Sequence, residues 1–242
     1  MQGTAKPVLE MHGISMIHRA GLVETHALRD VDLRVDEGEF VSILGPSGSG
    51  KSSLLAVAGL LEVPTRGEYR FCGEDVTSLG DGACSALRCR SIGFVFQGFH
   101  LVPDIDIHNN VELPLRLRGV GGRERRRRTR EALARVGLEG RAHHFPAQLS
   151  GGQQQRAAIA RAIVGRPRLV LADEPTGNLD SRMAEGVMDL LAGLNASGST
   201  VLVVTHDVAV AARTERRLHM IDGALAEFDG GGAVPLRAGW SR

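Results

Sequence analysis

The stretch from Phe40 to Leu60 constrains the fold more than any other part of the chain. A short apolar run, FVSIL (Phe40–Leu44), stops at the glycine-rich segment GPSGSGKS (Gly45–Ser52), and Lys51–Leu60 is predicted to be a helix. The apolar run predicts a buried parallel strand. The glycine-rich segment matches G-x-x-x-x-G-K-[ST] in the strand–loop–helix context that this pattern requires. The sequence therefore predicts an α/β protein with a phosphate-binding loop at the end of a strand.

The residue types in this loop suit the phosphates of a nucleotide. Its glycines allow a tight turn whose backbone N–H groups point at phosphate oxygens, Lys51 would reach the β- and γ-phosphates, and Ser52 would bind Mg²⁺. Lys51 is conspicuous because Lys6 is the only other lysine in the chain. The nucleotide contacts expected in the loop are Gly45, Pro46, Ser47, Gly48, Ser49, Gly50, Lys51, Ser52 and Ser53.

Two adjacent carboxylates follow a second apolar run, in LVLADE (Leu169–Glu174). Asp173 ends the predicted strand, where its carboxylate fits the Mg²⁺ shell. Glu174 can accept a proton from the attacking water as a general base. Two acids after a strand also occur in ordinary exposed turns, so the catalytic interpretation depends on the phosphate loop upstream.

Two further strand ends carry polar residues. Gln97 follows IGFVF (Ile92–Phe96), where its amide can touch Mg²⁺ or the attacking water. His206 follows TVLVVT (Thr200–Thr205), where its imidazole can hydrogen-bond the γ-phosphate. Each is weak alone, because polar residues end most strands and a lone histidine is more often structural.

The signature segment, LSGGQQQR (Leu149–Arg156), places a serine and two glycines just before a predicted helix. Ser150 can cap that helix, and the exposed N–H groups at its start suit a second anion. Together with the phosphate loop, Gln97, LADE, GNLD (Gly177–Asp180) and His206, this segment resembles the nucleotide-binding subunits of ABC transporters over about residues 8–228. The signature segment separates this family from kinases, GTPases and recombinase-type ATPases, which share only the phosphate loop.

The resemblance implies a P-loop NTPase with a RecA-like core, an antiparallel β subdomain and an inserted helical subdomain. We expect the ATP-binding domain over residues 5–229, its helical subdomain over about 98–165, and a flexible tail over 230–242. The family also implies a head-to-tail homodimer that sandwiches two ATP molecules. In such a dimer the signature segment of one chain covers the γ-phosphate that the other chain holds.

Further nucleotide contacts come only from the resemblance: Ser150, Gly151, Gly152, Gln153 and Asp180. The family usually stacks the adenine on an aromatic residue before the phosphate loop. The counterpart here is His18, whose smaller ring should hold adenine less strongly than a tyrosine would.

The amino-acid sequences of several segments resemble those of the lipoprotein-release and macrolide-export ATPases. That subfamily implies export or a mechanical stroke, with the ATPase bound to a separate permease on the cytoplasmic face of the inner or plasma membrane. Phe99, Leu101 and Val102 are expected to meet the permease, or else to belong to the core of the helical subdomain. The alternatives are an ATPase coupled to cell-division machinery and a soluble non-transport ABC ATPase.

The composition fits these expectations. The formal net charge is +1, and the run RERRRRTR (Arg123–Arg130) lacks the interleaved aromatic residues that base stacking uses. We therefore expect a solvated helix face, within a helix over Arg123–Val136 that ends at Gly137, and no nucleic-acid partner. No apolar run approaches the 18 or so residues of a membrane span. The three cysteines are expected to be free thiols.

Overall fold

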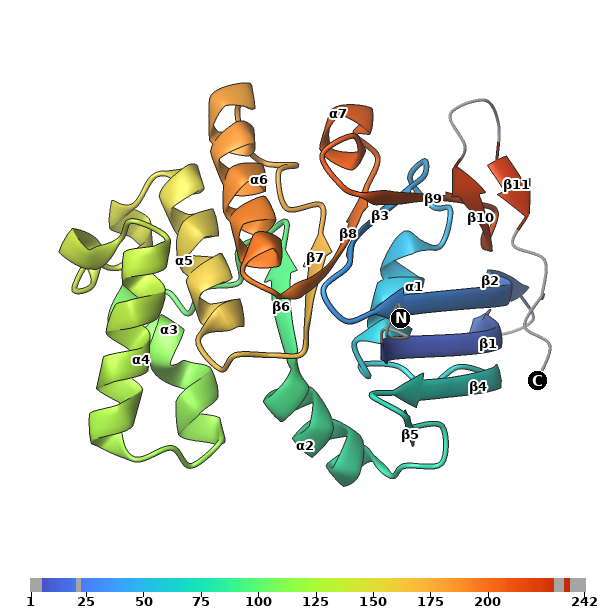
Figure 1. Cartoon of the computed structure of the whole chain (residues 1–242), viewed down its shortest axis with the longest axis horizontal. Coiled ribbons are helices and arrows are strands. Elements are labelled where there is room, and N and C mark those ends of the chain that lie inside the picture. Colours follow the sequence, from blue (N-terminus) through green and yellow to red (C-terminus); the bar gives the residue numbers. More distant parts are fainter. Residues whose placement is uncertain (1–5, 21–22, 229–232, 236–242) are drawn as a thin grey trace, which may run out of the picture. The chain divides into compact units, whose positions relative to one another are not determined.

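The computed structural model describes residues 6–20, 23–228 and 233–235. The chain divides into two compact units, residues 1–84 with 202–242 and residues 85–201 (Figure 1). The first unit carries the phosphate loop and His206. The second carries Gln97, the signature segment and the two adjacent carboxylates. The expected tail over 230–242 lies outside the described residues, except for the backbone of Ala233–Pro235.

An antiparallel sheet in the first unit contains the segments VLEMHGI and LRDVDLRV, whose alternating apolar residues predict two early strands. Its strands run in the order β2-β1-β4-β5. In the β1–β2 ladder Met11 lies opposite Leu33, and both side chains are buried. The bounds are β1 (Pro7–Ala20), β2 (Val23–Asp36), β4 (Arg66–Phe71) and β5 (Glu74–Asp75).

A second set of strands in this unit includes the strand that leads into the phosphate loop. Its order is β11-β10-β9-β3-β8, and β3 pairs with β9 in parallel. The bounds are β3 (Phe40–Leu44), β8 (Thr200–Thr205), β9 (Arg216–Ile221), β10 (Ala224–Phe228) and β11 (Ala233–Pro235). The segment IDGAL (Ile221–Leu225), with Asp-Gly in the turn, predicts a hairpin. The structure confirms it, since Asp222 and Gly223 both have positive φ, as a tight hairpin turn requires.

Helix α1 (Lys51–Ala58) follows the phosphate loop, and α7 (Val208–Ala211) follows β8. The predicted helix over Lys51–Leu60 is two residues too long. Gly59 caps α1, and Leu60 has a left-handed φ of 57°, which takes the chain out of the helix. The buried Tyr69 hydroxyl donates to the Ala58 carbonyl (2.7 Å) and so ties β4 to the end of α1. Burial raises the pKa of Tyr69 well above its usual value.

The second unit contains two parallel strands and several helices. Helix α2 (Asp81–Ser91) leads into it, and β6 (Ile92–Phe96) pairs with β7 (Leu169–Asp173). Its other helices are α3 (Ile107–Leu117), α4 (Gly122–Arg135), α5 (Gly151–Ile163) and α6 (Ser181–Ala196), with short 3-10 turns at Glu139–Arg141 and Pro146–Gln148.

The expected helix over Arg123–Val136 is α4, shifted by one residue at each end. It ends before Gly137, whose φ of +69° suits a residue just past a helix. Thr129 and Leu133 are buried, whereas Arg126 and Arg130 are exposed. The arginine run therefore forms a solvated helix face, as expected.

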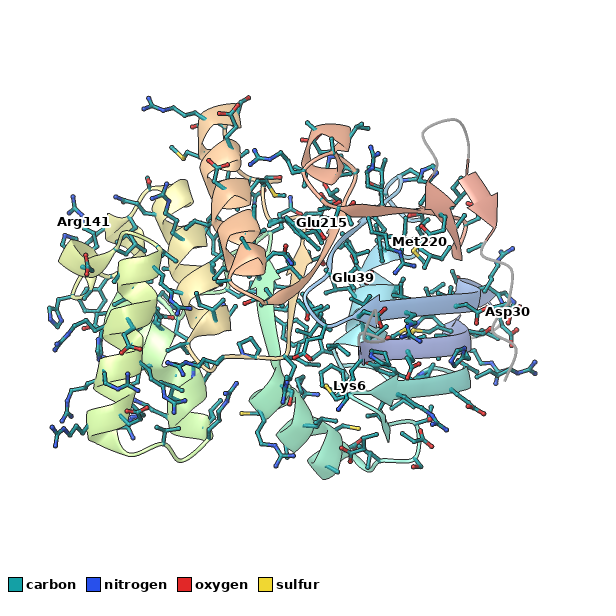
Figure 2. All side chains as sticks on the ribbon, viewed as in Figure 1. Lys6, Asp30, Glu39, Arg141, Glu215 and Met220 are labelled. Carbon is teal, nitrogen blue, oxygen red and sulfur yellow. The ribbon has the colours of Figure 1, made fainter. Side chains whose placement is uncertain are left out.

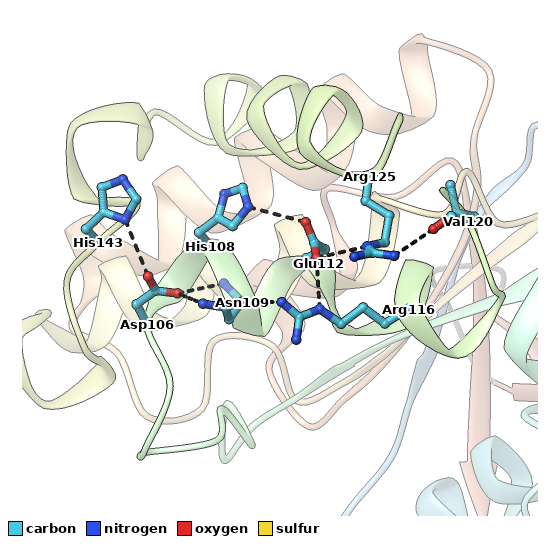
Figure 3. Close-up of polar contacts among 8 residues, drawn as sticks. All are labelled: Asp106, His108, Asn109, Glu112, Arg116, Val120, Arg125 and His143. Atoms are coloured by element: carbon cyan, nitrogen blue, oxygen red, sulfur yellow. Dashed lines mark hydrogen bonds and ion pairs between the residues drawn. The ribbon is translucent and has the colours of Figure 1, made fainter. Parts of the chain in front are cut away.

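Helices α3, α4 and α5 pack on one another, all within the range expected for a helical subdomain. A polar network crosses the contact between α3 and α4 (Figure 3). Its centre is the carboxylate of Glu112, which is only 4% exposed and accepts hydrogen bonds from Arg116 (2.8 Å) and Arg125 (3.0 Å). A second carboxylate, Asp106, caps α3 and lies 3.4 Å from His143.

Candidate nucleotide site

The phosphate loop leaves no room for a side chain at its first or its sixth position. A Cβ at Gly45 would collide with the carbonyl of Met220, the β9 residue labelled in Figure 2. A Cβ at Gly50 would collide with the Ala27 carbonyl, and Gly50 has a φ of +103° that disfavours other residues. Helix α1 starts at this glycine without a side-chain cap, so its first N–H groups are available to an anion.

Lys51 supplies the positive charge of the loop. Its side chain is 7% exposed, and its ammonium donates to the carbonyls of Gly45 (2.8 Å) and Pro46 (2.9 Å). Within the part of the chain that the structure describes, no carboxylate pairs with it. A buried ammonium without a counter-ion, beside free N–H groups, strongly favours an anion such as a phosphate.

His206 belongs to the same unit and lies close to the loop along the backbone. The Gly45 amide donates to the carbonyl of Thr205 (3.2 Å), so β8 ends beside the first residue of the loop. The side chain of His206 is exposed, and the next residue, Asp207, caps α7. The structure thus brings His206 and the phosphate loop together, as the sequence predicts.

In the second unit the predicted Mg²⁺ and water contacts lie at the ends of β6 and β7. Phe96 is the register partner of Asp173, so Gln97 follows β6 at the level where Glu174 follows β7. Gln97 is exposed, and its amide donates to Asn178 Oδ1 (3.2 Å). Asn178 donates in return to the Gln97 carbonyl (2.9 Å). The structure therefore brings Gln97 together with the GNLD segment.

Glu174 adopts a strained backbone conformation. Its φ is 45°, which costs of order 1–3 kcal/mol for a residue other than glycine. The Glu174 carbonyl accepts from the Gly177 amide (3.0 Å) in the turn that follows. Strain of this kind concentrates at active sites, so it supports the catalytic interpretation of Glu174.

The signature segment forms the start of α5, and the predicted cap is confirmed. The Ser150 hydroxyl accepts from the Gln153 amide (3.4 Å), and the Gln153 side chain accepts from the Ser150 amide (3.0 Å). This reciprocal pair is a capping box. Gly151 and Gly152 follow in the first turn, and a Cβ at Gly152 would lie 2.8 Å from the sulfur of Met183.

The two remaining predicted nucleotide contacts, Asp180 and His18, lie at the start of α6 and on β1 respectively. Asp180 caps α6 by accepting from the Met183 amide (2.9 Å). His18 lies on β1 opposite Thr25 and is exposed. Its adenine contact stays a prediction, as do the roles of the other site residues.

The structure also shows residues that the sequence did not single out. Asn178 lies inside the GNLD segment and bonds Gln97. Gln155 and Arg161, both on α5, bond the backbone beyond Glu174 and beyond Gln97 respectively. Of the three residues expected to meet the permease, Val102 is 38% exposed, whereas Phe99 and Leu101 are half-buried. Their role stays a prediction.

The phosphate loop and the uncapped helix that follows it define a phosphate-loop nucleotide-binding protein. Residues 28–177 match the family described as ABC transporter. The chain therefore belongs to the ABC transporter family, as one of its ATP-binding, ATP-hydrolysing cassettes. Among the described residues, no helix has both the length and the apolar composition needed to cross a membrane.

Similar proteins cover the chain almost end to end. It is 46% identical to the uncharacterized ABC transporter ATP-binding protein YknY of Bacillus subtilis, over 93% of this chain and 97% of YknY. It is also 46% identical to the macrolide export ATP-binding/permease protein MacB 1/2 of Paracoccus denitrificans, over 93% of this chain but only 34% of that relative.

A solved structure confirms the fold class. The ATP-binding cassette MJ0796, as a dimer in a post-hydrolysis state with ADP and Pi, superposes with a TM-score of 0.83 at 44% identity. The alignment covers 90% of this chain and 98% of MJ0796.

Proposed function

We propose that this cassette powers a separate membrane permease of the export or force-transmitting type. The alignment with MacB 1/2 supports this proposal, because that relative's name joins an ATP-binding part to a permease and this chain matches one third of its length. The full-length match to YknY supports a cassette that works as a separate chain. The permease would then recruit the cassette to the cytoplasmic face of the membrane.

Each motif has a proposed role toward ATP. Backbone N–H groups within the loop Gly45–Ser53 and the Lys51 ammonium bind the β- and γ-phosphates and offset their charge. In exchange for ATP phosphates, Lys51 gives up its bonds to the Gly45 and Pro46 carbonyls. His206 hydrogen-bonds the γ-phosphate, and His18 stacks on the adenine.

The chemistry of Ser52, Gln97 and Asp173 fits Mg²⁺. They supply hydroxyl, amide and carboxylate oxygens, which are the donors that Mg²⁺ takes alongside substrate phosphates. Bound Mg²⁺ would neutralise charge on the β- and γ-phosphates.

Glu174 is the proposed general base. Its carboxylate accepts a proton from water as the water oxygen attacks the γ-phosphorus and the bond to the ADP oxygen breaks. Glu174→Gln keeps the size of the side chain but cannot accept the proton, so hydrolysis should fall by roughly 10²–10⁴-fold while ATP still binds. Steady-state turnover near that of the wild type would reject this role.

The working form is a head-to-tail homodimer. Each composite site combines one chain's phosphate loop with the other chain's signature segment, in which Ser150, Gly151, Gly152 and Gln153 face the γ-phosphate. Asp180 lies at the same interface. The dimeric MJ0796 structures support association of such cassettes.

Mixing two inactive variants tests this arrangement. Ser150→Arg and Lys51→Ala should each inactivate a homodimer, because every site then carries one lesion. In a mixed dimer both lesions fall in one site and the other site is intact, so ATP-driven dimerisation should return, together with some hydrolysis. If neither returns in mixed dimers isolated by two affinity tags, the signature segment does not act across the dimer.

Coupling to the permease is tested by purification from membranes. A permease with few membrane helices, encoded beside this gene, should co-purify with the tagged cassette. Replacing Phe99, Leu101 and Val102 with Ser should weaken that association and leave the ATPase activity of the free cassette largely intact. A large drop in the thermal midpoint would show instead that these side chains are core. Association with a substrate-binding protein would favour import over the proposed export.

A further inference from the structure

Gln155 is a fully buried polar residue in the middle of the α5 helix. Its side-chain amide donates to the carbonyl of Pro175 over 2.8 Å. Its Oε1 atom has no hydrogen-bond partner among the described residues, and the residue is 0% exposed. Gln155 thus reaches a loop 20 positions later in the chain through one donor and leaves its acceptor unused.

Packing alone does not favour a glutamine at this position. An unsatisfied buried acceptor costs about 1–3 kcal/mol. A methionine of similar volume would fill the space without that cost. A buried polar atom without a hydrogen-bond partner calls for an explanation.

The contact is made directly beyond Glu174. Pro175 follows Glu174, which has the strained φ of 45°. The Glu174 carbonyl is held by the Gly177 amide at 3.0 Å, and the Pro175 carbonyl is held by Gln155 at 2.8 Å. The two peptide groups that follow Glu174 therefore each have a fixed hydrogen bond, and the one from Gln155 is the only one of the two that comes from outside the loop.

We propose that Gln155 is a positioning residue that sets the direction of the Glu174 side chain by holding the Pro175 carbonyl. This inference rests on the proposed role of Glu174 as general base. Gln155 lies five positions after Ser150 on the helix that Ser150 caps. A ligand that shifts the start of α5 therefore also shifts the donor that holds the backbone beyond this chain's own Glu174. The helix links the signature segment to the base of the same chain.

The first test is Gln155→Met. Because a misplacement of about 1 Å in a catalytic group costs up to roughly 10²-fold in rate, kcat should fall by about 10- to 100-fold. The KM for ATP should stay within about twofold, since Gln155 is fully buried and is not among the proposed nucleotide contacts. The matched control is Thr129→Val on α4. Like Gln155, Thr129 is buried and has a side-chain polar atom without a hydrogen-bond partner among the described residues. This control should leave kcat unchanged.

A double-mutant comparison separates positioning from a general structural effect. If Gln155 acts through the Glu174 carboxylate, adding Gln155→Met to Glu174→Gln should not lower the residual single-turnover rate further. A further drop equal to that of the single Gln155→Met variant would overturn the proposal, as would a wild-type kcat in Gln155→Met.

Two further outcomes test whether the variants fold and whether Glu174 is the general base. If Gln155→Met does not fold, Gln155→Asn keeps a polar amide in the core but withdraws the donor by about one bond length, and it should show the same split of kcat and KM. Loss of folding in both variants would make Gln155 a packing residue and refute the inference. Near-normal turnover in Glu174→Gln would instead reject the proposed base, independently of Gln155.

Discussion

Glu112→Gln should destabilise the second unit more than the removal of any exposed carboxylate on α4. The Glu112 side chain is 4% exposed and joins α3 to α4 through Arg125, while Arg116 and His108 (3.4 Å), both on α3 itself, also contact its carboxylate (Figure 3). The glutamine keeps the shape of the side chain but removes its charge. Both arginines then lose a charge-assisted hydrogen bond.

The exposure of the two arginines sets the size of the effect. Arg125 is 27% exposed, so its bond to Glu112 should contribute about 1.5–3 kcal/mol. It keeps a second acceptor, the Val120 carbonyl at 2.8 Å, which limits the loss. Arg116 is 49% exposed, and its pair should add no more than about 1 kcal/mol. We expect a total loss of about 2–3 kcal/mol, or roughly 5–10 °C in the thermal midpoint.

The lowered pKa of Glu112 determines how this loss of stability depends on pH. Burial raises the pKa of Glu112, but hydrogen bonds and charge from Arg116 and Arg125 outweigh it, so the pKa lies below its ordinary value of 4.5. A lowered folded-state pKa gives stability that is fully present above pH 4.5 and is lost as the pH falls through the folded pKa. The gap between wild type and Glu112→Gln should therefore be constant at neutral pH and close in acid.

Urea unfolding followed by circular dichroism measures the gap, with Glu131→Gln as the control. Glu131 is 46% exposed and also pairs with arginines, so its loss should cost less than about 1 kcal/mol. If Glu112→Gln costs no more than Glu131→Gln at pH 7, the buried carboxylate does not hold the two helices together. A gap that widens in acid would refute the assigned sign of the pKa shift.

Three further predictions concern the nucleotide site. Arg161→Lys should lower kcat several-fold, because a lysine cannot reproduce the planar pair of donors that holds the Phe99 carbonyl (2.9 Å) and the carbonyl of the next residue. It should also speed amide hydrogen exchange in the residues after Gln97, where the backbone of Phe99 has a strained positive φ. Gly177→Ala should lower kcat with the fold intact by circular dichroism, because its Cβ would lie 2.7 Å from the Gln97 amide nitrogen. His18→Ala should weaken ATP in nucleotide titrations; unchanged affinity would place the adenine elsewhere.

The phosphate loop and its strand were predictable because their chemistry fixes residue types at consecutive positions. The different roles of the three glutamines in the signature segment could not be predicted from the sequence. Gln153 returns to the Ser150 amide, Gln154 donates to the Leu149 carbonyl, and Gln155 is buried against Pro175. Successive helical residues point about 100° apart, so their surroundings depend on packing that the sequence pattern does not contain.

Helix α3 was not predicted, because a proline inside a helix usually ends it. Pro114 lies within α3, where its ring removes the hydrogen bond to the carbonyl of the residue four positions earlier. That residue, Asn110, is fully buried and its side-chain amide donates to the carbonyls of Val102 and Ile105. These bonds tie the helix to the loop before it, and helix propensity does not reveal them.

Helix α1 starts without a side-chain cap, and no carboxylate among the described residues pairs with Lys51, so a bound nucleotide should add stability that the nucleotide-free chain lacks. A ligand that binds only the folded chain adds RT ln(1 + [L]/Kd), about 2.7 kcal/mol at one hundred times Kd. When nucleotide is plentiful, the unit containing the loop is therefore held closed against local opening. When nucleotide is depleted, that unit opens more often and becomes a better protease substrate.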